Sequence, residues 1–307
     1  MRIFALPQGD PVSLKGAEPD LQNAKGLSVQ KTTLVIAGVA LMGLGACGGS
    51  GGAVSSQFAG SEAPSGIEDL IGLTFPVRVA SLGYENGTVT TVTRDTWSLR
   101  YTSSTTAVLS SAYGTFFLSD DGGMLVGESG GFEVQVTNPN GGDYVALFLI
   151  SVGDADAMTG STSAAFFGLE TTVAGVDALV ENNATAMYEG GSLLLVEYGD
   201  DLSSIEQIDG TADLSVDFGT GEVSGALLET PTSTISLVNG VVSGNGFAGT
   251  MAVGGDLGIV MSIDTSDVDG LFFGGAAEEL AGTFEGTGTY ANEPATFGGA
   301  FGAISTP

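Results

Sequence analysis

The sequence contains no histidine and a single cysteine, Cys47, so little of the usual catalytic chemistry is available to it. Catalytic triads need a histidine beside their nucleophile, and zinc sites need histidine or cysteine ligands. Only carboxylates remain for acid–base work. The chain has 36 of them, mostly at turn positions, and no pair stands out as a general acid and base. We expect no catalytic residue, with a carboxylate-dependent glycan hydrolase as the enzyme class left open.

Metal and haem sites are equally poorly supported. Asp120-Asp121-Gly122-Gly123 and Asp154-Ala155-Asp156 offer oxygen ligands for calcium, but neither completes a known calcium-binding loop. Phe166-Phe167 and Phe272-Phe273 could stack on a ligand, although their position beside glycines in strand-like segments favours core packing. Direct haem binding lacks a histidine ligand. We therefore predict no metal site and no cofactor.

The one cysteine follows an export signal. Lys31 precedes a short apolar run, which ends in Leu44-Gly45-Ala46-Cys47. This end resembles the lipobox of bacterial lipoproteins, which implies cleavage before Cys47 and attachment of fatty acyl chains such as palmitate to it. The alternative is a plain secretory signal with an incidental cysteine. Gly48 stands where an aspartate would favour the inner membrane, so the resemblance implies a lipid anchor in the outer membrane.

Residues 1–46 are thus predicted to be a lipoprotein signal peptide, and residues 47–65 a flexible tether rich in glycine and serine. Four of the seven basic and three of the 36 acidic residues precede Cys47, which leaves three basic and 33 acidic residues behind it. Such a surface repels phosphate backbones and anionic headgroups. We exclude nucleic acid as a partner and expect membrane contact through the lipid alone, while a basic protein partner stays possible.

The remaining chain reads as an all-β protein in two parts. The 50 glycines and nine prolines of the full sequence indicate short strands and many turns. In residues 66–160 the alternation of apolar and polar residues is visible but irregular, for example at Trp97, Leu99 and Tyr101, and we predict a small β-rich domain. In residues 161–307 the alternation is clean and predicts an antiparallel barrel of about eight strands with inward glycines.

Several local elements of the second part are predicted from the same pattern. Gly219-Thr220-Gly221 and Asn239-Gly240 read as turns between strands, and Leu257 to Ile263 reads as one strand. Ala276 to Leu280 is long enough for about one helical turn. Phe297 to Phe301 is predicted to be the strand that closes the sheet.

The stretch from Gly270 to Phe284 carries a resemblance. It is similar to the signature of the C-terminal barrel of the transferrin-binding protein B family, roughly Gly-x-Phe-Phe-Gly-Pro-x-Ala-x-Glu-x-Gly-Gly-x-Phe. The family's proline is Gly275 here, and the first of its paired glycines is Ala281. The matching positions are Gly270, Phe272, Phe273, Gly274, Ala277, Glu279, Gly282 and Phe284.

Further positions also fit the family. Gly168 and Thr171 match a Gly-x-x-Thr-Pro segment at the start of its barrel, with Thr172 in place of the proline. The part before the barrel corresponds by its order in the chain to the family's handle domain. The resemblance implies a surface-exposed binding lipoprotein that captures a protein or an iron- or haem-bearing ligand, with an outer-membrane transporter as a candidate partner. The alternative is a structural or shielding envelope lipoprotein with no specific soluble ligand.

Overall fold

The computed structural model describes residues 67–85, 88–121, 124–141, 145–154, 159–198 and 205–306. The predicted signal peptide, Cys47 and the tether lie outside these residues. No helix in the described part of the chain is long and apolar enough to span a membrane.

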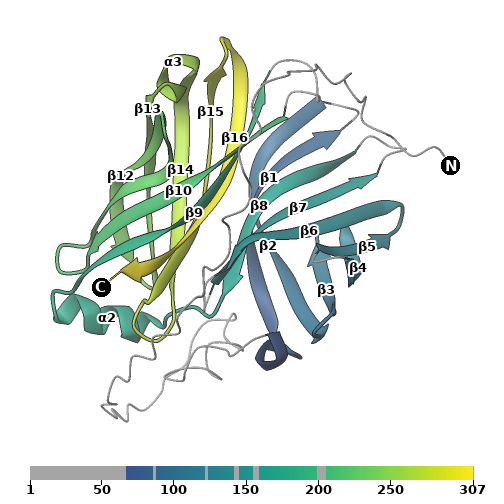
Figure 1. Ribbon diagram of the computed structural model, residues 1–307, viewed down its shortest axis with the longest axis horizontal. Coiled ribbons are helices and arrows are strands. Elements are labelled where there is room, and N and C mark those ends of the chain that lie inside the picture. Colours follow the sequence, from purple (N-terminus) through teal and green to yellow (C-terminus); the bar gives the residue numbers. More distant parts are fainter. Residues whose placement is uncertain are drawn as a thin grey trace, which may run out of the picture. The chain divides into compact units, whose positions relative to one another are not determined.

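The first half folds into a closed antiparallel barrel in which each strand pairs with the next along the chain and β1 pairs with β8. A short 3-10 helix, η1 (Ile67–Leu70), precedes it. The half is β-rich as predicted, and the structure shows in addition that it is closed. Its strands, coloured blue to teal in Figure 1, are β1 (Thr74–Glu85), β2 (Thr88–Ser103), β3 (Thr106–Ser111), β4 (Gly114–Asp121), β5 (Met124–Ser129), β6 (Phe132–Gly141), β7 (Val145–Asp154) and β8 (Thr159–Gly168).

The second half is another closed barrel of eight strands, in which β9 pairs with both β10 and β16. This confirms the predicted all-β fold with an antiparallel barrel at its end. The helix α2 (Val173–Glu181) connects the two barrels, and the single turn α3 (Leu257–Val260) precedes β14. The strands, green to yellow in Figure 1, are β9 (Thr185–Tyr198), β10 (Ile205–Asp217), β11 (Glu222–Thr230), β12 (Ser233–Ser243), β13 (Gly246–Gly255), β14 (Met261–Phe273), β15 (Glu279–Tyr290) and β16 (Glu293–Thr306).

Each barrel is filled by the side chains of alternate strand residues, as the sequence pattern predicts. Trp97, Leu99 and Tyr101 are buried in the core of the first barrel. In the second barrel the same holds for the predicted inward series of β10, in which Leu214 and Val216 are fully buried. The cores are therefore two separate interiors, one inside each closed sheet.

Inward glycines of the second barrel make room for phenylalanine rings on the neighbouring strands. Four glycines each lie directly opposite a phenylalanine whose ring occupies the space where a Cβ would stand. An added Cβ would lie 2.2 to 2.5 Å from the nearest ring carbon. Glycine is thus required here for space as well as for curvature. The pairs are Gly270 with Phe247, Gly282 with Phe301, Gly286 with Phe297 and Gly299 with Phe284.

Two local predictions are wrong: the turn at Asn239-Gly240 and the helical turn at Ala276 to Leu280. Asn239-Gly240 does not end a strand, because β12 continues through it with a bulge between Val238 and Val241. Asn239 has φ 54°. The left-handed backbone conformation that Asn-Gly adopts in hairpin turns therefore forms a bulge here. Ala276 to Leu280 is not helical either, because the left-handed Gly274 and Ala277 form a tight turn and β15 begins at Glu279.

Two further predictions are corrected, by α3 and by β8, and helix α2 is an element that the sequence analysis missed. The strand predicted over Leu257 to Ile263 begins only at Met261, since the residues before it form α3 and place Leu257 in the core. The first barrel ends at Gly168, beyond the predicted boundary at residue 160, because β8 closes it. Helix α2 was not predicted; Thr172, which replaces the family's proline, caps it by accepting a hydrogen bond from Gly175 N at 3.1 Å.

Candidate functional site

The family-like stretch Gly270 to Phe284 forms the end of β14, a tight turn and the start of β15. Alternate residues point to opposite faces of this hairpin. Phe272 and Phe284 fill the core of the second barrel, while Phe273 points outward. The turn is fixed by Tyr188, whose buried hydroxyl donates to the Ala277 carbonyl at 2.7 Å. Burial, and to a lesser degree Glu278, raise the pKa of Tyr188, so the phenol stays protonated as this bond requires.

The same turn holds the segment that leaves the first barrel. Thr171 donates from its backbone N to the Phe272 carbonyl and from its hydroxyl to the Gly274 carbonyl, at 2.7 and 2.8 Å. Gly274 N donates in return to the Leu169 carbonyl at 2.9 Å. Thr171 is the threonine of the predicted Gly-x-x-Thr segment. The two family-like segments, about 100 residues apart in the sequence, therefore form one hydrogen-bonded unit.

Outward residues of the signature also contact the first barrel. Phe273 meets Phe166 edge-to-face at 5.9 Å, within an apolar cluster shared by both barrels. Glu279 is 1% exposed and accepts a hydrogen bond from Val145 N at 2.8 Å. A buried carboxylate needs such donors because its desolvation is costly. The signature thus builds the second barrel on one face and attaches the first barrel on the other.

We predict that Glu279→Ala lowers the free energy of unfolding by about 1–3 kcal/mol, because it leaves Val145 N buried without its partner. Glu279→Gln keeps an acceptor oxygen of the same shape and should lose less than half as much. Urea unfolding followed by far-UV circular dichroism measures both variants. Equal stability of the alanine and glutamine variants would show that the bond contributes little.

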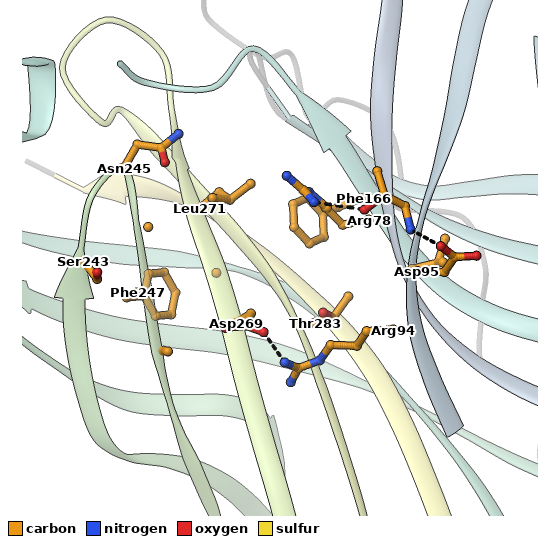
Figure 2. Close-up of a pocket in the computed structure, with 15 residues that line it drawn as sticks. Arg78, Arg94, Asp95, Phe166, Ser243, Asn245, Phe247, Asp269, Leu271 and Thr283 are labelled. Carbon is orange, nitrogen blue, oxygen red and sulfur yellow. Dashed lines mark hydrogen bonds and ion pairs between the residues drawn. The ribbon is translucent and has the colours of Figure 1, made fainter. Parts of the chain in front are cut away.

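A cleft of about 600 Å³ lies beside this attachment, between β1, β2 and β8 on one side and β13 to β15 on the other. Figure 2 shows Arg78, Arg94 and Phe166 facing Phe247, Leu271 and Thr283 across it. Asn245, in the turn before β13, borders the cleft and donates to Glu170 at 3.2 Å. The walls combine apolar side chains with a few charged groups, which is the usual composition of a ligand-binding cleft.

The two arginines of the cleft are held very differently. Arg78 donates to Thr96 Oγ1 at 2.9 Å and lies 3.9 Å from Glu170. Arg94, whose side chain is 18% exposed, faces three carboxylates of the second barrel and pairs with Asp267 at 2.8 Å, with Asp269, and with Glu285 at 3.7 Å. One cation therefore offsets only part of the charge of three neighbouring carboxylates.

The pKa of Glu285 reflects this imbalance. Burial raises it most, the Arg94 guanidinium lowers it, and the charges of Asp267 and Asp269 raise it further, with a net increase. A carboxyl whose folded pKa lies above its unfolded value favours folding more as it becomes protonated. This contact between the barrels should therefore be less repulsive in mild acid than at neutral pH.

We predict that Arg94→Met destabilises the protein by about 1–2 kcal/mol at pH 7, because three carboxylates then face one another without a cation. The loss should shrink near pH 4.5, where carboxylates take up protons. Arg100→Met is the matched control, since Arg100 is exposed on the same face of β2. Thermal unfolding at both pH values measures the effect, and a loss independent of pH would contradict it.

Among the described residues, no three histidine, cysteine, aspartate or glutamate side chains are grouped so that they could hold a metal ion. The calcium-type segments Asp120–Gly123 and Asp154–Asp156 lie partly outside the described residues. The cleft offers guanidinium and amide donors beside aromatic and aliphatic surface, a combination suited to binding.

Sequence reasoning did not find this cleft, although one signal was available. The only three basic residues after Cys47 are Arg78, Arg94 and Arg100. All three occupy outward positions of the paired strands β1 and β2, opposite the inward Val77, Val79 and Leu99. All three have even residue numbers, and alternate residues of a strand share a face. This pattern could have placed the positive charges on one face of the hairpin. Their carboxylate partners on β14 and β15 could not be found without the structure.

The sequence comparisons agree with this architecture. Residues 180–305 match the family described as C-lobe and N-lobe beta barrels of Tf-binding protein B. The second barrel is therefore similar to the barrels of the transferrin-binding protein B family. This confirms the resemblance drawn from Gly270 to Phe284, because the matched region contains that whole stretch. No curated protein matches the sequence.

Similar solved structures come from the same family. A tryptophan-to-alanine variant of transferrin-binding protein B from Haemophilus parasuis Hp5 is 17% identical, with 75% of this chain and 45% of that chain covered at a TM-score of 0.48. Isotype 1 transferrin-binding protein B from serogroup B Neisseria meningitidis is 19% identical, with coverages of 76% and 44% and a TM-score of 0.47. The chain spans less than half the length of these relatives.

Proposed function

We propose that this protein is a lipid-anchored binding protein of the outer membrane, which captures a protein or an iron- or haem-bearing ligand at the cell surface and catalyses no reaction. The observation that carries the proposal is the transferrin-binding protein B barrel formed by residues 180–305. Proteins of this family are binding proteins, and those in the solved structures carry transferrin binding in their names. Transferrin itself is one candidate among iron-bearing proteins, because one fold serves many ligands.

The construction of the barrel supports a binding role. A closed sheet exposes no unpaired strand edge, so the barrel does not pair with strands of other chains at the cell surface. Its closed wall holds the turns that the structure describes in defined positions, which limits the entropy lost when a partner binds them. The chain supplies no histidine for catalysis or haem ligation. An iron-bearing ligand would therefore be recognised through its protein or polar surface.

Lipid attachment at Cys47 would keep the barrels at the membrane. Cleavage before this residue leaves a tether rich in glycine and serine ahead of the first barrel. Such a linker behaves as a flexible coil and lets the folded part reach a ligand above the membrane surface. Several acyl chains on one cysteine give stable anchoring, which a single chain does not. An outer-membrane transporter is the natural recipient of captured iron or haem.

Growth on defined iron sources tests the proposal. A deletion strain and its complemented parent are grown with transferrin, haemoglobin or haem as the sole iron source, and with iron sulfate as the control. We expect the deletion strain to grow more slowly on at least one ligand-borne source and normally on iron sulfate. Unchanged growth on every source would contradict capture of an iron-bearing ligand and favour a shielding envelope lipoprotein.

A further inference from the structure

Exposed apolar side chains gather at one end of the second barrel. The described residues include seven large hydrophobic side chains that are exposed, and five of them lie at the end where α2 is found, with exposures of 39% to 58%. Single exposed apolar residues are ordinary, but several of them at the same end of a barrel indicate a contact surface there. The five, which we call the α2-end patch, are Val173, Val180, Met187, Val241 and Ile304.

The topology brings these residues to the same end. The turns between β10 and β11, β12 and β13, and β14 and β15 all lie there, as do the start of β9 and the end of β16. Helix α2 crosses this end: Gly175 packs near the Gly275 carbonyl, and Asn183 near Gly219. Figure 1 shows α2 and the C-terminal end of the chain together at this end of the barrel.

Two members of the patch are neighbours on the outer wall. Met187 pairs with Thr306 and Ile304 pairs with Glu189, so Met187 and Ile304 are diagonal neighbours across β9 and β16. Val173 and Val180 are seven residues apart in α2 and therefore share one face of the helix. Val176, three residues after Val173 and four before Val180, lies on the same side of the helix and is buried in the barrel core, so the two valines flank the contact with the barrel and remain partly exposed.

A hollow of about 600 Å³ opens beside Val241, between β11 and β12. The bulge at Asn239-Gly240 shapes it, and its walls include Val238 and Val241 with the exposed carboxylate of Glu222 at the rim. An apolar wall that ends in a carboxylate suits a lysine or arginine side chain, whose methylene stem packs on valines while its charged head stays at the acid.

Charge identifies the kind of partner. Residues 169–307 contain 21 acidic residues and no basic one. Around the α2-end patch, Asp177, Glu181, Glu189 and Glu222 are exposed. A second copy of this barrel or an anionic membrane would be repelled by such a rim, whereas a protein surface with an apolar centre and basic border would be attracted.

We propose that the α2-end patch is the docking surface for a protein partner whose apolar contact area is bordered by lysine and arginine. This inference rests on the proposed binding function and adds to it a location and a partner chemistry. Apolar contacts at the centre would supply affinity, and the acidic rim would speed association and select against acidic partners.

The test uses a fluorescent amphipathic peptide of leucine and lysine as the probe, with a leucine–glutamate peptide of equal length as its control. The protein is the mature chain with Cys47→Ser, which removes the lipid site. We expect saturable binding of the lysine peptide, weakened about tenfold in the variant Val180→Ser, Met187→Ser and Ile304→Ser. Phe117→Ser is the matched control, because Phe117 is 76% exposed on the first barrel.

Three outcomes would overturn the proposal: unchanged affinity in the triple variant, an equal loss with Phe117→Ser, or equal binding of the glutamate peptide. Binding to phosphatidylglycerol vesicles through the same three residues would show that the partner is a membrane and not a protein. If the triple variant fails to fold, Glu181→Gln with Glu222→Gln tests the acidic rim, and an unchanged affinity there contradicts the proposal equally.

The failure of this inference can be told apart from failure of the proposed function. If intact cells that carry the triple variant take iron from a ligand as well as wild-type cells do, the α2-end patch is wrong and capture stands. If the peptide binds at the patch but deletion of the gene changes growth on no iron source, capture is wrong and the docking surface stands.

Discussion

Replacing Gly270 with alanine is expected to lower the free energy of unfolding by about 1–3 kcal/mol, with a larger loss for valine. The reason is local. A Cβ at this position would lie 2.2 Å from the Phe247 ring, and the three nearest atoms all belong to that ring. Phe247 cannot move aside easily, because its ring already packs against Phe272 at 5.5 Å and Phe301 at 6.2 Å in the barrel core.

Two further variants make this prediction specific. Gly275→Ala, in the same turn region, should be neutral, since no atom lies within 4 Å of its added Cβ. Phe247→Leu introduced beside Gly270→Ala should recover part of the loss, because the smaller side chain frees the space. Urea unfolding of the wild type, Gly270→Ala, Phe247→Leu and the double variant gives the coupling energy, with Gly275→Ala measured alongside as the control. An alanine variant as stable as wild type, or no recovery in the double variant, would show that the ring does not need the glycine.

Replacing Cys47 with serine is expected to move almost all of the protein from the membrane fraction to the soluble fraction. Serine keeps the size of the side chain but cannot carry the thioether-linked lipid, and no other cysteine can replace it. Labelled palmitate should be incorporated by the wild-type protein and not by Cys47→Ser. The lost acyl chains contribute about 0.8 kcal/mol for each buried methylene, which explains the large effect.

A matched variant tests the sorting step separately. Gly48→Asp keeps the lipid site but places an aspartate after the cysteine, so it should stay in the membrane fraction and move from the outer to the inner membrane. Separation of the two membranes on a density gradient measures this. A Cys47→Ser protein that remains membrane-bound would contradict lipid anchoring and leave the plain secretory signal.

The second barrel could be predicted from the sequence because strands such as β10 bury one face only. Alternation there puts Leu214, Val216 and Phe218 on the inside of the closed sheet. The first barrel was harder to predict. Its last strand, β8, is covered on both faces: Ala165 and Phe167 fill the first barrel while Ala164 and Phe166 pack in the cluster shared by the barrels. Alternation vanishes in such a strand.

Other elements depended on contacts that the sequence does not display. Asn239-Gly240 has the composition of a hairpin turn, but β12 continues through it because it pairs with both β11 and β13. Ala276 to Leu280 has good helix formers, but hydrogen bonds from Tyr188 and to the Leu169 carbonyl fix a tight turn. Tertiary partners override local preference in both cases.

The candidate site could be predicted only in part. The residues of the Gly270 to Phe284 stretch were predicted to be structural, and the structure shows why the motif spans so many of them: one face of the hairpin fills the barrel and the other attaches its neighbour. The attachment through Glu279 requires Val145, 134 residues away in the sequence. Sequence spacing carries no information about such a pair.

Binding of labelled iron-bearing proteins to intact cells tests the central claim most directly. Fluorescent transferrin and haemoglobin are added to cells with the wild-type protein, with Cys47→Ser and with the gene deleted, and bound fluorescence is measured with and without unlabelled competitor. The account predicts saturable binding of at least one ligand to wild-type cells alone. Equal binding to all three strains, or a wild-type protein that added protease cannot reach, would contradict capture at the cell surface.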